Sequence, residues 1–184
     1  NGLVTEHLKV PVAKETSLHQ ELGLPANAKI ILMVSKLKIW KRVDRGLHIL
    51  KKILESKTSS QPYYLLIIGT GEMEPALKAL ARELNIQDNV KFLGGLPHQQ
   101  VVSYLHQADL FWSLYDISNL GNPILEAIYL SKPVISLKQK DLETLFGLNA
   151  RNLIELSQIE QIVSLTTDIL ENPAPYKEVV NYSK

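Results

Sequence analysis

The chain contains no cysteine among its 184 residues. Disulfide bonds, thiolate zinc sites and cysteine nucleophiles are therefore excluded, and the composition fits a reducing compartment. No apolar run approaches the length of a transmembrane helix, and no charged-then-apolar signal peptide opens the chain. Neither sign of charge is in excess, because 20 Lys and Arg stand against 19 Asp and Glu. This balance argues against a general nucleic-acid-binding protein, which is usually markedly basic.

What the chain does contain is typical of one soluble globular domain. Hydrophobic residues make up 45% of the sequence and charged residues 21%, and the length suffices for a substantial core. There is no internal repeat, no low-complexity tract and no linker that would divide the chain, so we expect a single domain over residues 1–184. The first residue is Asn1 rather than Met. We therefore expect a processed chain or, as we favour, a fragment of a longer protein.

Short apolar runs alternate with amphipathic segments along the chain. The apolar runs, rich in β-branched residues, predict buried strands at 29–35, 63–68, 90–94, 110–115 and 133–137, with an edge strand at 153–156. Helical spacing or helix signals between them predict helices at 17–22, 43–54, 75–84, 101–107, 142–148 and 159–170, with a further helix that opens within 118–126. This alternation predicts an α/β fold with a doubly wound, mostly parallel six-stranded sheet. Residues 1–28 then form a lead-in and residues 171–184 a tail.

A basic loop follows the first predicted strand. It contains Lys36, Lys38, Lys41 and Arg42. In parallel sheets ligands bind outside the carboxyl ends of the strands, and lysine and arginine suit a diphosphate. The alternative is an ordinary solvated loop. Arg45, which follows an aspartate, is expected to form no more than a pair on the helix surface.

Two glycines, Gly69 and Gly71, follow the second predicted strand and open a helix. They allow a close approach of the backbone to a ligand, or they simply form a tight strand-to-helix turn. A dinucleotide fingerprint needs a third glycine where this chain has Glu74. The missing glycine, and the lack of an acidic residue closing the strand at 90–94, count against a dinucleotide-dependent oxidoreductase.

Residues 118–126 read as a loop and the first turn of a helix between two strands. Their amides can point at one spot, and Pro123 is tolerated in a first helical turn. Glu126 has only apolar neighbours close in sequence, so burial without a partner would be costly. A partly buried carboxylate suits the vicinal hydroxyls of a ribose. The alternative for Glu126 is a favourable charge near a helix N-terminus, without a ligand.

The five histidines show no metal-ligand spacing, and no Ser-His-Asp arrangement is suggested. His98 and His106 are isolated in the sequence and are interpreted as structural residues.

The residues quoted so far also resemble a known family. Eight segments, in this order and spacing, are similar to the C-terminal, nucleotide-sugar-binding half of a GT-B glycosyltransferase of family four, the group 1 type. They are Asn1-Gly2, Ser35-Lys36-Leu37, residues 40–44 (WKRVD), 68–72 (IGTGE), 90–94 (VKFLG), 108–111 (ADLF), 119–127 (NLGNPILEA) and 132–135 (KPVI). The resemblance covers residues 1 to about 170.

The resemblance implies a role for each matched site residue. Lys36 and Lys41 resemble the basic pair that binds the donor diphosphate, and they are the candidate catalytic residues because they would stabilise the leaving diphosphate. Glu126 resembles the second glutamate of the family's Glu-x7-Glu motif, which holds the ribose. The other donor-binding candidates are Gly69, Gly71, Ser118, Asn119, Leu120, Gly121 and Asn122. The donor would be a nucleotide-diphosphate sugar, and transfer would retain the anomeric configuration without a cofactor or an obligatory metal.

The chain departs from the family pattern at Ser118, where the family usually has the first glutamate of that motif. A serine brings no negative charge to the transferred sugar, although Asp116 could substitute in part. Residues 140–144 also differ from the usual glycine-rich loop. A non-catalytic nucleotide-binding domain of the same fold, which has lost activity, is therefore the alternative function.

The resemblance also places this chain within a larger enzyme of the hexosyltransferase type. Its partners would be a nucleotide-sugar donor and its own N-terminal domain, which carries the acceptor site and is missing from the sequence. We therefore expect this fragment alone to be inactive. Many relatives use lipid-linked or polysaccharide acceptors, which implies a cytoplasmic location, at the inner membrane face if the full-length protein associates with the membrane.

Overall fold

The computed structural model describes residues 17–56, 61–116, 121–138, 153–154, 158, 160–173 and 176. Within them, one six-stranded sheet has the order β3-β2-β1-β4-β5-β6, and every pairing is parallel. The strands are β1 (Lys29–Val34), β2 (Tyr63–Ile68), β3 (Val90–Gly94), β4 (Leu110–Ser113), β5 (Val134–Leu137) and β6 (Leu153–Ile154). The predicted doubly wound parallel sheet is confirmed.

The chain reverses its direction of growth between β1 and β4. From β1 it proceeds to β2 and β3 on one side, and from β4 to β5 and β6 on the other. The neighbours β1 and β4 are paired through Ile31 with Leu110 and Leu32 with Phe111. In open parallel sheets such a reversal leaves a crevice at the carboxyl ends of the two strands, and ligands bind there.

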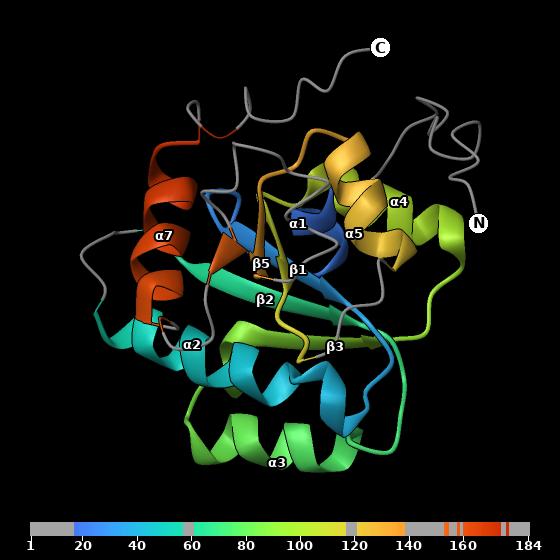
Figure 1. Ribbon diagram of the computed structural model, residues 1–184, viewed down its shortest axis with the longest axis vertical. Coiled ribbons are helices and arrows are strands. Elements are labelled where there is room, and N and C mark those ends of the chain that lie inside the picture. The colour runs from blue at the N-terminus through green and yellow to red at the C-terminus, as the bar shows by residue number, and fades with distance from the viewer. Residues whose placement is uncertain are drawn as a thin grey trace.

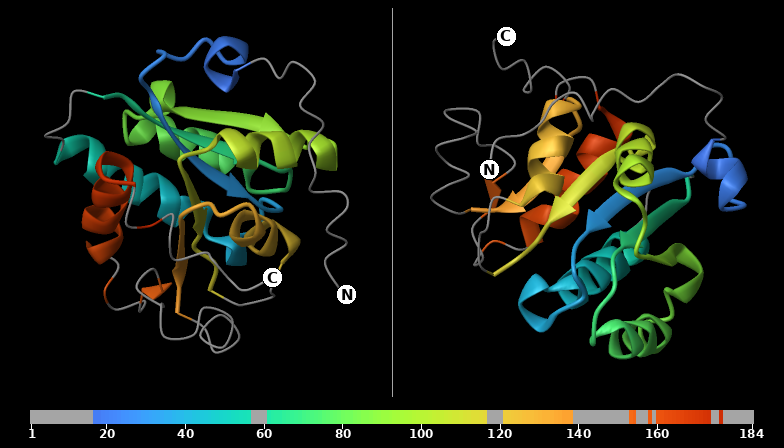
Figure 2. Two further views of the ribbon diagram at one scale, coloured as in Figure 1. Left: turned by 90° about the horizontal axis from the view of Figure 1, so that it is seen from above. Right: turned by 90° about the vertical axis from the view of Figure 1, so that its right-hand side faces the viewer.

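Helices cover both faces of the sheet (Figures 1 and 2). One face carries α2 (Val43–Glu55), α3 (Glu74–Glu83) and α7 (Glu160–Glu171), and the other carries α1 (Leu18–Glu21), α4 (His98–Gln107) and α5 (Asn122–Tyr129). Two short 3-10 helices, η2 (Ile39–Lys41) and η3 (Gln87–Asn89), lie in the loops.

Alternation along the strands divides the core into two clusters. On β1, Ile31 and Met33 pack toward α2, whereas Ile30 and Leu32 pack toward α4 and α5. The central strands are apolar on both sides, because both faces of the sheet are covered by helices. This arrangement explains why their sequences are continuous apolar runs rather than alternating ones.

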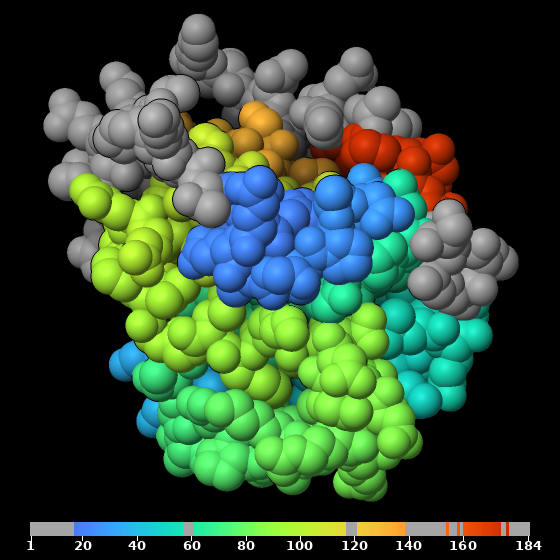
Figure 3. All heavy atoms as spheres, turned by 180° about the vertical axis from the view of Figure 1, so that it is seen from behind, coloured from blue at the N-terminus to red at the C-terminus, as the bar shows by residue number. Residues whose placement is uncertain are grey.

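The short helix α1 lies against α4, as the space-filling view from behind shows (Figure 3), and two hydrogen bonds join the two helices. The backbone N–H of Leu18 donates to Oε1 of Gln107 at 2.9 Å, and the Tyr104 hydroxyl donates to Oε1 of Glu21 at 2.8 Å. Burial, together with this carboxylate, raises the pKa of Tyr104. The lead-in from residue 17 onward is thereby part of the domain.

Several predicted boundaries need correction. The fourth strand was expected to run to Tyr115, but it ends at Ser113, because the following residues turn to contact the loop after β1. Helix α4 begins at His98, three residues before its first buried apolar residue, Val101. The predicted helix at 142–148 lies outside the described residues. No helix in the described part of the chain is both long and apolar enough to cross a membrane.

Candidate functional site at the carboxyl edge of the sheet

The loops after β1 and β2 are joined by backbone hydrogen bonds. The N–H groups of Ser35 and Leu37 donate to the carbonyls of Ile68 and Thr70 at 3.0 and 2.9 Å. The N–H of Gly69 donates to the carbonyl of Gly94, at the end of β3, at 2.7 Å. The carboxyl ends of the three strands are therefore held together beyond the sheet itself.

The close contact between the loops after β1 and β2 requires the two predicted glycines. Gly69 has φ +136, and a Cβ there would lie 1.8 Å from the carbonyl oxygen of Ser35. A Cβ on Gly71 would lie 2.3 Å from the carbonyl oxygen of Leu37. The close approach that these glycines permit is thus to the chain's own loop. A donor-binding role for Gly69 and Gly71 stays a prediction.

The lysines of the basic loop differ in their exposure and in the side chains that they contact. The Lys36 side chain is exposed, and Nζ of Lys38 lies 5.0 Å from the centroid of the exposed Trp40 ring. Nζ of Lys41 lies 4.1 Å from the ring centroid of Tyr115, the second residue after β4. Burial lowers the pKa of Lys41. Of the two predicted phosphate-binding lysines, Lys41 is therefore the one whose ammonium is positioned by the residues that follow β4.

Tyr115 connects the two strands at the crevice. Its hydroxyl donates to the carbonyl oxygen of Val34, the last residue of β1, at 2.9 Å. The side chain is buried, and burial raises the pKa of this phenol to about 12. The ring therefore stays neutral at physiological pH and offers its face to the Lys41 ammonium, which is a favourable cation–π arrangement.

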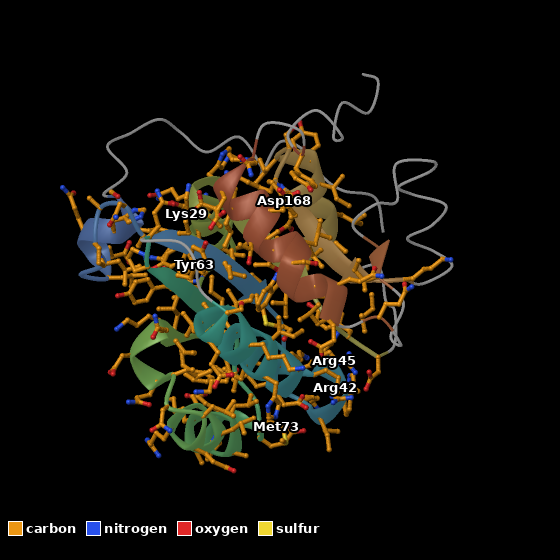
Figure 4. The ribbon with its side chains drawn as sticks, turned by 90° about the vertical axis from the view of Figure 1, so that its left-hand side faces the viewer. Lys29, Arg42, Arg45, Tyr63, Met73 and Asp168 are labelled. Atoms are coloured by element: carbon orange, nitrogen blue, oxygen red, sulfur yellow. The ribbon has the colours of Figure 1, made fainter. Side chains whose placement is uncertain are left out.

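Two arginines hold Asp116, next to Tyr115. Arg45 is only 6% exposed; its Nη2 lies 2.5 Å from Oδ1 of Asp116, and its Nη1 donates to the carbonyl of Leu114 at 2.6 Å. Arg42 donates to Oδ2 of Asp116 at 3.0 Å and to the carboxylate of Asp44. Figure 4 shows Arg42 and Arg45 together, at the opposite end of the sheet from Lys29.

This cluster corrects one expectation. Arg45 was predicted to form no more than a surface pair beside Asp44, but it is buried and its partners are Asp116 and a β4-loop carbonyl. Adjacent residues on a helix do not face each other, so Arg45 does not pair with Asp44. Asp44 pairs with Arg42, which precedes α2 in the left-handed conformation. Burial alone would raise the pKa of Asp116, but the hydrogen bonds from Arg45 and Arg42 outweigh it and the pKa is lowered. A role for Asp116 in place of the glutamate that the family has at position 118 stays a prediction.

Glu126 lies in the second turn of α5 and is 4% exposed. Its Oε1 is 2.9 Å from Nε2 of His98, the first residue of α4. Within the described part of the chain, His98 is the only side chain that contacts this carboxylate. Glu126 is therefore buried rather than exposed on the outer face of the helix, and the histidine supplies the partner that a buried carboxylate requires.

His98 was missed as a site residue, because it was interpreted from its isolation in the sequence. Its position carried a usable signal: it follows Pro97, after the loop that leaves the predicted third strand, and so belongs at the carboxyl edge of the sheet.

The remaining predicted residues belong to the loop before α5. Ser118, Asn119 and Leu120 lie outside the described residues. Gly121 occupies the position before the first residue of α5, and Asn122 begins the helix with an exposed side chain. Helix α5 thus begins at the carboxyl edge next to β4, as expected.

A cavity of about 220 Å³ lies between α2 and α7, on the other face of the sheet from α5, and Arg42 and Arg45 form part of its lining. Its other charged lining residues include Lys52, which pairs with Glu160, and Asp44, which pairs with Arg42. Among the described residues, no group of three or more His, Asp or Glu side chains is placed to hold a metal ion.

Curated proteins show sequence similarity to this chain. The chain is 26% identical over 166 residues to the GDP-mannose-dependent monoacylated alpha-(1-6)-phosphatidylinositol monomannoside mannosyltransferase of Corynebacterium glutamicum, covering 86% of this chain and 42% of that protein. The chain thus spans less than half the length of this curated relative.

Solved structures show the same fold. The C-terminal domain of the group 1 glycosyl transferase LpcC from Francisella tularensis superposes with a TM-score of 0.74 at 14% identity, covering 95% of this chain and 92% of that one. HepE from Anabaena, solved with UDP and glucose, gives a TM-score of 0.71 at 20% identity, covering 89% of this chain and 44% of that one.

The family model described as glycosyl transferases group 1 matches residues 14–184, which include every element of the sheet and the whole carboxyl edge. The doubly wound sheet, the crevice between β1 and β4 and the order of the motifs agree with this match. The chain therefore belongs to the glycosyl transferases group 1 family.

Proposed function

We propose that this chain is the donor-binding domain of a longer, two-domain glycosyltransferase. The enzyme transfers a sugar from a nucleotide-diphosphate sugar to an acceptor with retention of configuration. The observation that carries the proposal is the buried Glu126 carboxylate in α5, the helix that follows β4 at the carboxyl edge of the sheet. A carboxylate in such a position accepts hydrogen bonds from vicinal ribose hydroxyls, as acidic residues do in other nucleotide-binding sheets.

Lys41 supports the same proposal from the loop that follows β1. Its ammonium rests on the neutral Tyr115 ring, and none of the described residues offers it a carboxylate within salt-bridge distance. A partly buried cation with no anionic partner is suited to a diphosphate. In the reaction, Lys41 and the exposed Lys36 stabilise the negative charge that develops on the leaving nucleoside diphosphate. No step of this scheme is assigned to a metal.

Ser118 favours a second candidate, a nucleotide-binding domain that has lost catalysis. The transferred sugar meets a hydroxyl where the family usually supplies a carboxylate. Turnover of the full-length protein, compared with its Ser118→Glu and Glu126→Ala variants, separates the two functions. An active wild type that Glu126→Ala inactivates supports the enzyme, whereas an inactive wild type that Ser118→Glu activates supports the alternative.

Isothermal titration of the full chain with UDP, GDP and ADP tests donor binding directly. We expect at least one of the three to bind, and Lys41→Met to weaken its affinity by about 10- to 100-fold, because a charge-assisted hydrogen bond contributes roughly 1.5–3 kcal/mol. Lys29→Met is the matched control, because Lys29 stands at the amino end of β1 and pairs with Asp109. The absence of binding to folded protein by all three nucleotides would overturn the proposed donor site.

Acceptor and location follow from the family resemblance and stay proposals. The mannosyltransferase of Corynebacterium glutamicum is named for a phosphatidylinositol mannoside acceptor. We propose an acceptor of the lipid-linked or polysaccharide kind and a cytoplasmic location, with membrane association a property of the full-length protein.

A further inference from the structure

The His98 side chain crosses from the start of α4 to the carboxylate of α5. Its Nε2 lies 2.9 Å from Oε1 of Glu126, and the two side chains are 52% and 5% exposed. We propose that His98 is a positioning residue, which fixes the Glu126 carboxylate in the orientation that receives the ribose hydroxyls of the donor. This inference rests on the proposed donor-binding function and adds a residue to it.

The direction of the hydrogen bond follows from the chemistry of the two groups. A carboxylate oxygen accepts hydrogen bonds, so the Nε2–H of His98 is the donor and Oε1 of Glu126 is the acceptor. Among the described side chains, none forms a hydrogen bond with Oε2 of Glu126. The histidine thus occupies one oxygen and leaves the other oxygen, and the remaining lone pairs, for a ligand with two adjacent hydroxyls.

The pair is held by rigid elements on both sides. Pro97 is the residue before α4, and His98 is the first residue of this helix. The two helices share one apolar cluster, to which α4 contributes Val101 and Leu105 and α5 contributes Ile124. Because both backbones are fixed, the hydrogen bond fixes the carboxylate plane as well.

Fixing that plane has a consequence for affinity. A free glutamate side chain populates several rotamers, and ordering it at the moment of binding reduces the affinity. A carboxylate that is already oriented avoids this cost. His98 is half-exposed while Glu126 is buried, so the histidine forms the rim of the site and the glutamate its floor.

The competing explanation is an ion pair that merely joins α4 to α5. The two explanations differ in what the ligand must contain. A positioning residue acts through the ribose hydroxyls, so its removal should have no effect on a ligand that lacks them. A structural pair would change the binding of ribose and deoxyribose ligands equally.

The test uses the full chain with the nucleoside diphosphate that binds the wild type, together with its 2′,3′-dideoxy analogue, which has neither ribose hydroxyl. His98→Leu removes the donor, whereas His98→Gln places an amide N–H close to the position of Nε2. We expect His98→Leu to weaken binding of the ribonucleotide about tenfold and His98→Gln to restore it to within about threefold, since about 1.4 kcal/mol corresponds to tenfold. With the dideoxy analogue, the loss for His98→Leu should fall below about threefold.

One further measurement distinguishes the possible outcomes. In a Glu126→Gln background, His98→Leu should have little additional effect, because its action passes through that carboxylate. Equal losses for ribose and deoxyribose ligands, or no loss at all in folded His98→Leu, would overturn the positioning role while leaving the donor site in place. A wild type that binds no nucleoside diphosphate would overturn the proposed function first, and this inference with it.

Discussion

Replacing Arg45 with methionine should destabilise the domain far more than the same change at Arg42. Both arginines contact Asp116, but Arg45 is nearly fully buried, whereas a third of the Arg42 side chain is exposed. The comparison isolates burial, because the chemistry of the two side chains and one of their partners are the same. Methionine fills much of the volume of arginine, which keeps the contribution of a new cavity small.

The expected magnitude follows from the contacts. Arg45→Met removes two charge-assisted hydrogen bonds, to Leu114 and Asp116, and leaves a buried carbonyl without its donor. Each such bond contributes roughly 1.5–3 kcal/mol, and an unsatisfied buried acceptor costs about 1–3 kcal/mol. Asp116 keeps Arg42 and its side chain is 35% exposed, so breaking the bond to Asp116 should cost little, and the loss of the buried bond to Leu114 sets the magnitude. We expect about 2–4 kcal/mol for Arg45→Met, against roughly 0–1 kcal/mol for Arg42→Met, as for partly exposed pairs.

Urea unfolding followed by tryptophan fluorescence measures both changes. Trp112 is fully buried and reports on the core, and thermal unfolding gives an independent estimate of about 2–4 °C per kcal/mol for a domain of this size. If Arg45→Met unfolds at the wild-type urea concentration, or if Arg42→Met costs as much, the guanidinium of Arg45 is not the anchor of the β4 loop.

Three further predictions concern the same edge of the sheet. The pKa of Asp116 is lowered in the folded state, so its contribution to stability is present above its unfolded pKa and is lost as the pH falls through its folded pKa; the stability difference between the wild type and Asp116→Asn should shrink over that acid range in pH-dependent unfolding. Gly69→Ala should cost about 2–4 kcal/mol in urea unfolding, because its Cβ would meet a carbonyl oxygen, whereas Gly94→Ala, also at positive φ but with nothing within 4 Å, should cost about 1 kcal/mol; equal costs would contradict the close-approach explanation. Tyr115→Phe should lose about 1–2 kcal/mol of stability with the bond to the carbonyl at the end of β1, yet bind nucleoside diphosphate within threefold of the wild type in a calorimetric titration, since the ring under the lysine is kept; a large loss of affinity would mean that the hydroxyl itself contacts the ligand.

The sheet was predictable because its signal is local and strong. A strand such as β1 is covered on both faces and must be apolar throughout, so its position is visible in the sequence alone. Boundaries were less accessible where side chains decide them. The fourth strand ends at Ser113 rather than Tyr115, because the tyrosine hydroxyl bonds to the end of β1, a contact between residues 81 positions apart.

Pairings between distant residues could not be predicted from local pattern. The partner of Arg45 lies 71 positions away in sequence, and the partner of Glu126 lies 28 positions away. Arg45 was predicted to pair with its neighbour and His98 was interpreted as structural, whereas the apolar neighbours of Glu126 indicated only that burial of this carboxylate would require a partner. A residue at the carboxyl edge of a parallel strand should therefore be evaluated by the strand it follows and not by its isolation in the sequence.

The same distant contacts explain how a crevice formed by loops can be ready for a ligand. Loops are usually the least constrained parts of a domain, and ordering them on binding lowers the affinity. Here the loop after β1 is bound to the loop after β2 by backbone hydrogen bonds. The residues after β4 are bound to the end of β1 by Tyr115 and to α2 by Arg45. In these contacts the polar groups of the loops and strand ends form hydrogen bonds with one another. Lys41, in contrast, forms no salt bridge with a carboxylate among the described residues, and among these residues Glu126 forms a hydrogen bond only with His98. These two charged side chains are therefore available to the diphosphate and the ribose of a nucleoside diphosphate.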